Sequence, residues 1–228
     1  MDYQWLVFDA DNTLLDFTRS ARIAFSETIE SIGLAFDDRL FDIYHEINLE
    51  CWADLEAGRI TPGELKIRRF SQFLDQVGKP GDPAKMNSLY FEVLKRATYT
   101  IDGAVEVLGI LSQKGYRMAV ATNGLADVQR PRLAEAGIGQ FFQEILVSEE
   151  IGYFKPNPGF FHTVIQRLQA RETDRLLMIG DNMYSDIEAA KKAGWDTCWY
   201  NPRGEDNPLV EAPDFTIGRL HQLLDILA

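Results

Sequence analysis

Two aspartates, Asp9 and Asp11, stand directly after the first apolar run of the chain, residues 5–8. A short run of Trp, Leu, Val and Phe predicts a buried strand, and side chains two residues apart on an extended chain point the same way. Two carboxylates held so close repel each other, and one takes up a proton unless a cation lies between them. The pair therefore predicts a metal site, a nucleophile with an acid/base neighbour, or both.

Two further groups of polar residues follow later apolar runs. Thr122, Asn123 and Gly124 place a hydroxyl, an amide and an exposed backbone at an expected strand-to-helix turn. The donors of such a turn can bind phosphate oxygens. Lys155, followed by a proline that stiffens its loop, supplies one positive point charge. We expect both groups to bind the oxygens of a phosphoryl group.

A fourth group, Asp181 and Asp186, follows the apolar run 176–179 and comes directly after Gly180. Together, four aspartates against one lysine give the expected site a formal charge of −3. A phosphate dianion does not enter a site of that charge without a cation. We therefore expect Mg²⁺, which prefers oxygen ligands and bridges carboxylate to phosphate. The result is a phosphoryl-transfer site that works by positioning and charge neutralisation.

Each group taken alone has an ordinary structural explanation. Acidic pairs and Thr-Asn-Gly sequences are common in turns, and a single lysine is usually solvated. The order of the four groups, each at the expected end of a strand, is what favours one shared site.

The expected elements place these groups at one edge of a sheet. Apolar runs predict strands, and helical periodicity between glycine and proline breaks predicts helices. The strands are expected at residues 4–9, 116–122, 144–148, 175–179, 197–200 and 215–217. The helices that alternate with them are expected at residues 103–114, 125–136, 157–169 and 185–193. This alternation predicts an α/β fold with a Rossmann-like parallel sheet, which binds ligands at the carboxyl ends of its strands.

A helical insert interrupts this pattern after the first strand. Four helices without a strand between them are expected at residues 19–32, 37–57, 61–78 and 81–97. We therefore expect an α/β catalytic core, residues 1–17 and 99–228, and an inserted four-helix cap domain, residues 18–98. Since the insert leaves from the end of the first strand, we expect it to close over the ligand-binding edge as a lid.

Composition excludes several other classes of protein. The chain has 228 residues, of which 46% are apolar, and a formal charge of −12, which disfavours binding to a nucleic acid polymer. Cys51 and Cys198 lie far apart, so neither a zinc site nor a disulfide framework is expected. No apolar stretch is long enough to span a membrane, and residues 1–4 lack the basic region of a signal peptide. We expect a cytoplasmic protein, a monomer or weak homodimer, whose partner is a small phosphorylated metabolite.

The four groups, in this order, resemble the four motifs of the haloacid dehalogenase-like superfamily. The resemblance covers essentially the whole chain, including the helical cap of C1 type after the first motif. It implies that Asp9 is the nucleophile that forms an aspartyl-phosphate. It also implies that Asp11 protonates the leaving oxygen and then activates water.

The same resemblance implies the ligands of the phosphoryl group and of the metal. Thr122 and Lys155, with the turn at Asn123 and Gly124, would bind phosphoryl oxygens. The proposed Mg²⁺ ligands are the carboxylate of Asp9, the backbone carbonyl of Asp11, and Asp181, with Asp186 close by or acting through water.

The carboxylate of Asp11 separates phosphatases from dehalogenases within the superfamily. Dehalogenases lack it, because a halide leaves without a proton whereas an alkoxide needs one. The chain is most similar to bacterial 5′-nucleotidases that act on pyrimidine and modified nucleoside monophosphates, in the strings 9–14, 51–54, 58–61 and 197–201.

Three other functions remain open on the same sequence. The first is a sugar-phosphate or small-metabolite phosphatase, of the acylneuraminate 9-phosphatase or phosphoglycolate phosphatase type. The second is a phosphomutase. The third is a catalytically silent binding protein, although such a protein would be expected to lack Asp9 or Asp11.

The cap is expected to contact the base or sugar of the substrate. Its turn at residues 56–63 is the expected point of approach, and the candidate contacts are Trp52, Arg59, Lys66 and Arg69. The alternative is that the tryptophan packs inside the bundle and the cations are solvated.

Overall fold

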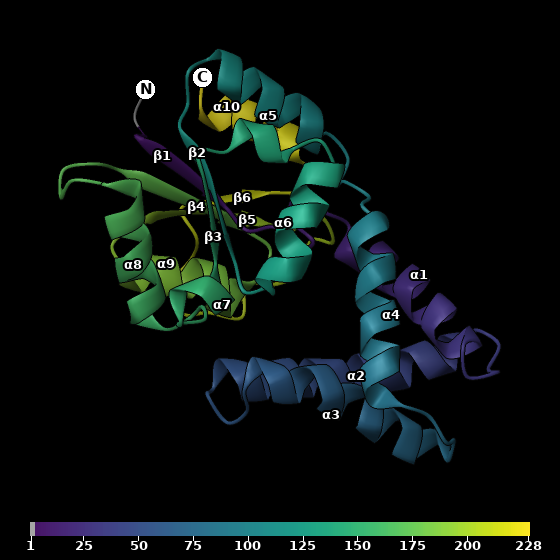
Figure 1. Ribbon diagram of the computed structural model, residues 1–228. Coiled ribbons are helices and arrows are strands. Elements are labelled where there is room, and N and C mark those ends of the chain that lie inside the picture. The colour runs from purple at the N-terminus through teal and green to yellow at the C-terminus, as the bar shows by residue number, and fades with distance from the viewer. Residues whose placement is uncertain (1–2) are drawn as a thin grey trace. The chain divides into compact units, whose positions relative to one another are not determined.

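A computed structural model describes residues 3–228. Residues 1 and 2, part of the segment 1–4 that was considered as a signal peptide, lie outside the described part. The chain forms two compact units (Figure 1). Among the described residues, one unit comprises residues 3–17 and Tyr99–Ala228, and the other comprises Thr18–Thr98.

A six-stranded sheet forms the centre of the first unit. Its strands lie in the order β3-β2-β1-β4-β5-β6, and each neighbouring pair is parallel. The strands are β1 (Trp5–Phe8), β2 (Met118–Thr122), β3 (Glu144–Val147), β4 (Leu176–Gly180), β5 (Asp196–Tyr200) and β6 (Phe215–Ile217). β1, β2 and β4 are buried along their whole length, which explains why they form continuous apolar runs. The predicted α/β class with a parallel sheet is confirmed.

Helices cover both faces of this sheet (Figure 1). Alternate residues of β1 point to opposite faces: Leu6 and Phe8 join one apolar cluster, and Trp5 and Val7 join the other. The first cluster includes residues of α5 (Ala104–Gln113), α6 (Ala126–Glu135) and α10 (Leu223–Ile226). The second includes residues of α8 (Pro158–Leu168) and α9 (Ala189–Lys192). The core is therefore two apolar layers with the sheet between them.

The register of the central strands brings the motif residues to one edge. Phe8, the last residue of β1, pairs with Val120 of β2 and with Ile179 of β4. The carboxyl ends of β1, β2 and β4 therefore lie at the same edge of the sheet. β1 is also the point at which the chain turns from one half of the sheet to the other, where ligands bind in open α/β sheets.

Two local elements differ from the sequence prediction. The helix expected over 185–193 begins earlier, as a π-helical segment η2 (Met183–Glu188), before α9. Its start is set by the side chain of Asn182, which accepts from the backbone N–H groups of Tyr184 and Ser185. Ser148, expected to end a strand, instead begins the short helix α7 (Ser148–Ile151). One turn of helix is too short to produce a periodic pattern.

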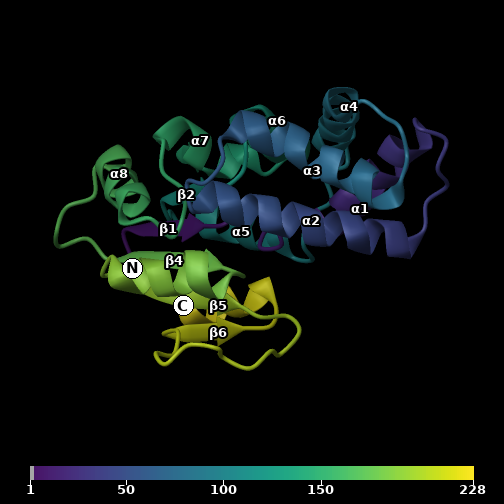
Figure 2. The ribbon, with the colours of Figure 1, turned by 90° about the horizontal axis from the view of Figure 1, so that it is seen from below.

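The second unit consists of four helices, and within residues 18–98 the structure contains no strand. The helices are α1 (Phe17–Glu30), α2 (Asp38–Glu56), α3 (Pro62–Val77) and α4 (Pro83–Arg96). Asp37, Thr61 and Asp82 cap α2, α3 and α4, and Thr61 forms the predicted capping box with Glu64. α2 and α3 run side by side in both views (Figures 1 and 2). The predicted all-helical insert is confirmed.

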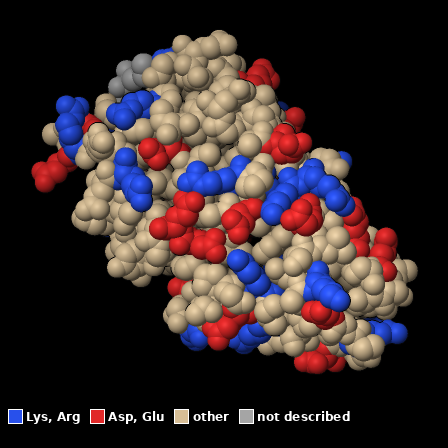
Figure 3. All heavy atoms as spheres, in the orientation of Figure 1, with Lys and Arg blue, Asp and Glu red and all other residues tan. Residues whose placement is uncertain are grey.

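The surface mixes both signs of charge. On the face drawn in Figure 3, Lys and Arg side chains are interspersed with Asp and Glu. Among the described residues, no helix is both long and apolar enough to cross a membrane.

Candidate active site

Four loops meet at the carboxyl edge of the sheet and carry the residues singled out in the sequence. Asp9 follows β1, Thr122 ends β2, and Asp181 follows β4. Lys155 lies in the loop between α7 and α8, and Asp186 lies in η2. The fold therefore brings all five residues to the same edge of the sheet.

Lys155 is the centre of the first group. Its ammonium group donates to Asp9 Oδ1 at 2.7 Å, to Asp186 Oδ1 at 2.6 Å and to the carbonyl oxygen of Ala121 at 2.8 Å. A lysine has three N–H donors, so all are used. The residue is only 1% exposed, and a buried ammonium needs such partners to offset its lost hydration.

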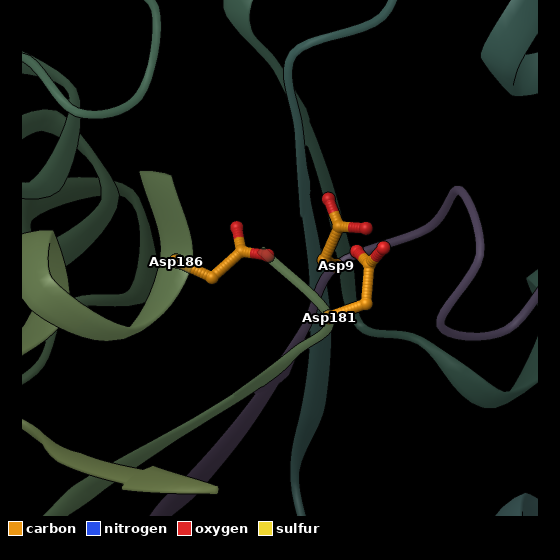
Figure 4. A group of neighbouring side chains, drawn as sticks. All are labelled: Asp9, Asp181 and Asp186. Atoms are coloured by element: carbon orange, nitrogen blue, oxygen red, sulfur yellow. The ribbon is translucent and has the colours of Figure 1, made fainter. Parts of the chain in front are cut away.

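Asp9, Asp181 and Asp186 form a carboxylate cluster. Each offers one oxygen, and these oxygens lie within 4.8 Å of one another. Figure 4 shows Asp186 reaching from its helix toward Asp9 and Asp181, whose carboxylates lie together. The donor set consists of oxygen alone, which fits a hard divalent cation such as Mg²⁺ better than zinc.

Burial and repulsion between carboxylates shift the pKa values of two acids of this cluster, Asp9 and Asp181. Burial raises the pKa of Asp9 well above its usual range, and Asp186 and Asp181 raise it further, while Lys155 opposes them. Burial and the Asp186 charge raise the pKa of Asp181 to about 7. Burial lowers the pKa of Lys155, but the carboxylates of Asp186 and Asp9 outweigh it and raise that pKa above its ordinary value. One lysine therefore does not compensate three carboxylates, and a further cation would stabilise them.

Gly180 is required for this packing. A Cβ atom built at Gly180 would lie 2.3 Å from Asp186 Oδ2, so only glycine leaves room for that carboxylate. Asp186 Oδ2 accepts from the backbone N–H of Asn182 at 3.1 Å. The indole N–H of Trp199, in β5, donates to the carbonyl oxygen of Asp181 at 3.0 Å and holds the same loop.

Thr122, at the end of β2, and Asn123, in the turn that follows, make different contacts. Thr122 Oγ1 accepts from the backbone N–H of Gly124 at 3.3 Å. The side chain of Asn123 accepts from the backbone N–H of Lys155 at 2.7 Å and donates to the carbonyl oxygen of Lys155 at 2.8 Å. Asn123 thus fixes the lysine loop, and its direct binding to phosphate stays a prediction.

The carboxylate of Asp11 lies in a separate group of contacts. Asp11 Oδ1 accepts from Arg132 Nη1 at 2.6 Å, and Asp11 Oδ2 accepts from Gln129 Nε2 at 2.9 Å. The side chain of Asp11 is not one of the three that form the carboxylate cluster. Binding of a metal by its backbone carbonyl stays a prediction.

Gln129 and Arg132 were missed in the sequence. They lie three residues apart in α6, directly after the Thr-Asn-Gly turn, and that spacing puts them on one helix face. Two long polar residues on a face turned to the sheet are the signal that could have revealed them. With Arg132 included, the formal charge of the residues at this edge is −2 rather than −3.

In the helical unit, Trp52 and Arg59 lie near the turn between α2 and α3. Trp52 is half-buried, and Arg59 is exposed, with its Nε 2.7 Å from Asp54 Oδ1. Lys66 is half-buried in α3. Contact of these residues with a substrate stays a prediction.

Arg69 differs from the other cap candidates because it is only 2% exposed. It donates from Nη1 to Asn48 Oδ1 at 3.0 Å and from Nη2 to Asn87 Oδ1 at 2.7 Å. It is therefore neither a surface contact nor a solvated cation in this unit.

The arrangement at the sheet edge can hold a dication and a phosphoryl group beside a buried aspartate. A family model described as haloacid dehalogenase-like hydrolase matches residues 3–194 of the chain. The chain belongs to this hydrolase family. The resemblance found in the sequence and the expectation of an enzyme are confirmed.

Individual proteins also match the chain over its whole length. Pyrimidine 5′-nucleotidase PynA of Streptococcus pneumoniae is 33% identical and is aligned over 100% of this chain and 96% of its own. Pyrimidine 5′-nucleotidase YjjG of Escherichia coli is 30% identical over 100% of this chain and 99% of its own. The crystal structure of the putative HAD-hydrolase YfnB of Bacillus subtilis, bound to magnesium, is 32% identical and covers 100% of this chain and 99% of that chain, with a TM-score of 0.92.

Proposed function

We propose that this chain is a Mg²⁺-dependent phosphomonoester hydrolase that acts through an aspartyl-phosphate. The observation that carries the proposal is the contact of Asp9 Oδ1 with the buried ammonium of Lys155 at 2.7 Å, beside Asp181 and Asp186. The lysine orients one oxygen of Asp9 and can also attract phosphoryl oxygens. No such crowding of acids is needed to stabilise a fold, whereas a phosphoryl-transfer site needs it to bind a metal.

The proposed reaction has two steps. In the first, a carboxylate oxygen of Asp9 attacks phosphorus, the bond from phosphorus to the leaving oxygen breaks, and Asp11 donates a proton to that oxygen. In the second, Asp11 takes a proton from water, the water oxygen attacks phosphorus, and the acyl-phosphate bond breaks. Inorganic phosphate leaves, and Asp9 is again a carboxylate. Thr122 donates a hydrogen bond to a phosphoryl oxygen throughout, and the ammonium charge of Lys155, whose three N–H donors are already used, attracts the phosphoryl oxygens.

The residues that would hold Mg²⁺ are Asp9, Asp181 and the backbone carbonyl of Asp11. Asp186 would act mainly through Lys155, because its two oxygens already accept from that lysine and from Asn182. When bound, the ion would supply positive charge that offsets the carboxylates and attracts the phosphate dianion.

The proposed substrate is a pyrimidine nucleoside 5′-monophosphate. Two relatives that align over the full chain at 33% and 30% identity carry the name pyrimidine 5′-nucleotidase. We propose that the helical unit, residues 18–98, selects the leaving group. The exposed Arg59 and the half-buried Trp52 are its candidate contacts with sugar and base.

A phosphate-release screen tests this proposal. The panel is UMP, dUMP, dTMP, purine monophosphates, sugar phosphates and phosphoglycolate, each with Mg²⁺ and with Asp9→Asn as the blank. We expect the highest kcat/KM for the pyrimidine nucleotides. Highest rates on a sugar phosphate or on phosphoglycolate would refute the nucleotidase proposal while leaving the phosphatase chemistry in place.

The metal requirement is tested in the same assay. EDTA is expected to remove activity, and added Mg²⁺ is expected to restore it. Turnover that persists without a metal would contradict the proposed mechanism.

A further inference from the structure

Two buried polar side chains of α6, Gln129 and Arg132, are not part of the four motifs. Each is only 1% exposed. Because they lie three residues apart, they share one face of the helix and can act on the same target. Arg132 Nη1 also donates to Gln129 Oε1 at 2.8 Å, so the two side chains restrain each other.

Their common target is Asp11. Arg132 Nη1 donates to one carboxylate oxygen of Asp11 at 2.6 Å, and Gln129 Nε2 donates to the other at 2.9 Å. The side chain of Asp11 is 29% exposed, whereas that of Arg132 is 1% exposed. The carboxylate is therefore held from its buried side and remains accessible from the other.

Gln129 also connects Asp11 to Thr122. Its Nε2 donates to Thr122 Oγ1 at 2.8 Å, so one amide group contacts both residues. Thr122 Oγ1 accepts a second hydrogen bond from the backbone N–H of Gly124. A hydroxyl oxygen that accepts twice keeps its own hydrogen as a donor, and here that donor can serve a phosphoryl oxygen.

Burial of Arg132 costs free energy that packing alone does not explain. Within the described residues, its Nε and Nη2 are buried without a hydrogen-bond partner. An apolar residue of similar size would avoid that cost at a position that only packs. A guanidinium at this position provides instead a short, directed hydrogen bond to Asp11.

We propose that Gln129 and Arg132 are positioning residues that orient Asp11 and keep it at a fixed separation from Thr122. The proposal rests on the proposed function, in which Asp11 transfers protons and Thr122 binds the phosphoryl group. Proton transfer to the leaving oxygen is sensitive to small displacements, so losing either contact should slow the chemical step more than it weakens binding.

The test compares two leaving groups in the first turnover, with enzyme in excess over substrate. Uridine leaving from UMP needs a proton, whereas p-nitrophenolate leaving from p-nitrophenyl phosphate is a stable anion and does not. For Arg132→Met and for Gln129→Leu, we expect the first-turnover release of uridine to fall about 10- to 100-fold. The release of p-nitrophenolate should change by less than about threefold. The steady-state KM for UMP should change by less than about threefold.

The chain provides a matched control on the same helix. Arg130 is exposed and pairs with Glu150 at 2.7 Å, so Arg130→Met removes an ion pair without affecting Asp11. Its rates should stay within about twofold of the parent. Gln129→Leu keeps the ion pair of Asp11 with Arg132. If Arg132→Met does not fold, the kinetics of Gln129→Leu still test the proposal.

Two results would overturn the proposal. One is an equal loss on both substrates, which indicates a general structural defect. The other is a further loss of uridine release when Arg132→Met is added to Asp11→Asn, since a residue acting through Asp11 has nothing left to position there. Failure of the proposed function itself looks different: the parent enzyme would release phosphate from neither substrate, or Asp11→Asn would retain the parent rate on UMP.

Discussion

Each of the two units contains at least one cation that is almost completely buried, and one from each unit, Lys155 and Arg69, can be compared because their charges are compensated in different ways. Lys155 in the α/β unit is 1% exposed and donates to the carboxylates of Asp9 and Asp186. Arg69 in the helical unit is 2% exposed, and its hydrogen-bond partners are the neutral amides of Asn48 and Asn87.

Aromatic rings complete the surroundings of Arg69. Its guanidinium carbon lies 5.2 Å from the ring centre of Phe70, 4.8 Å from that of Tyr90 and 5.0 Å from that of Phe91. Dipoles and rings stabilise a cation without perturbing acids. In contrast, Asp9, which contacts Lys155, and the neighbouring Asp181 have raised pKa values. Burial of a charge alone therefore does not indicate a reactive site; crowding of titratable groups around it does.

The largest effect should come from Asp9, one of the two acids that contact Lys155. Asp9→Asn keeps the size of the side chain but removes the nucleophile, so we expect turnover of UMP to fall about 10³-fold or more. Thermal unfolding should change little, because the amide oxygen can still accept from Lys155. The control is Asp127→Asn, an exposed position on α6, which should keep the parent rate. Appreciable turnover of UMP by Asp9→Asn would contradict the role of Asp9 as nucleophile. The acids around Lys155 would then not mark a reactive site, and the contrast with Arg69 would fail.

The second-largest effect should come from filling the space beside Asp186. Gly180→Ala places a methyl group where Asp186 Oδ2 lies, at 2.3 Å, and should displace the carboxylate from Lys155. We expect kcat to fall about 10- to 100-fold, as for other small misplacements of catalytic groups. Gly109→Ala is the matched control, since a Cβ atom there meets nothing within 4 Å in helix α5. It should stabilise the protein by about 0.5–1 kcal/mol and keep the parent activity. Equal activity of the two variants would show that the position of Asp186 does not matter.

The sequence predicted the fold well because the fold depends on local patterns. The strand Trp5–Phe8 is a continuous apolar run, and its buried position between two parallel neighbours follows from that pattern. The capping box at Thr61 is equally local. These signals need no knowledge of distant residues.

The partners within the site were less predictable because they depend on contacts between distant positions. Asp11 and Arg132 are 121 residues apart, and Asp9 and Lys155 are 146 apart. Motif order indicated that Lys155 belongs to the site, but nothing marked Arg132 as the partner of Asp11. Arg69 was a candidate contact with base or sugar because it lies in the helix that follows the cap turn at residues 56–63. Its burial depends on two asparagines from neighbouring helices, and asparagine carries no such signal in the sequence.

A third prediction concerns stability rather than catalysis. Arg69→Met removes the donors to Asn48 and Asn87 and leaves two buried amide oxygens unpaired, which should cost about 1–3 kcal/mol of unfolding free energy. Removal of a buried charge offsets part of this cost. Arg68→Met is the neighbouring control: its ion pair with Asp54 is partly exposed, so it should cost less than about 1 kcal/mol. Denaturant unfolding measures both. A loss of UMP turnover by Arg69→Met at unchanged stability would instead support the substrate contact expected from the sequence.

The smallest effect is a pH dependence of stability that comes from the carboxylate cluster of the α/β unit. The pKa of Asp181 is about 7 in the folded protein, against an ordinary value of 3.8. Between these values the folded protein holds a proton that the unfolded chain has lost, so without metal this group lowers stability as the pH rises toward 7.

Mg²⁺ should remove this penalty, and the size of its effect should depend on pH. At low pH the ion has to displace the proton of Asp181, whereas at high pH it binds a carboxylate that is already ionised. We therefore expect the rise in Tm caused by Mg²⁺ to be larger at about pH 8 than at about pH 5.5. NaCl at equal ionic strength is the control for screening. The same rise in Tm at both pH values would mean that Mg²⁺ does not bind at Asp181. The acids around Lys155 would then not form a metal site, which is the feature that sets Lys155 apart from Arg69.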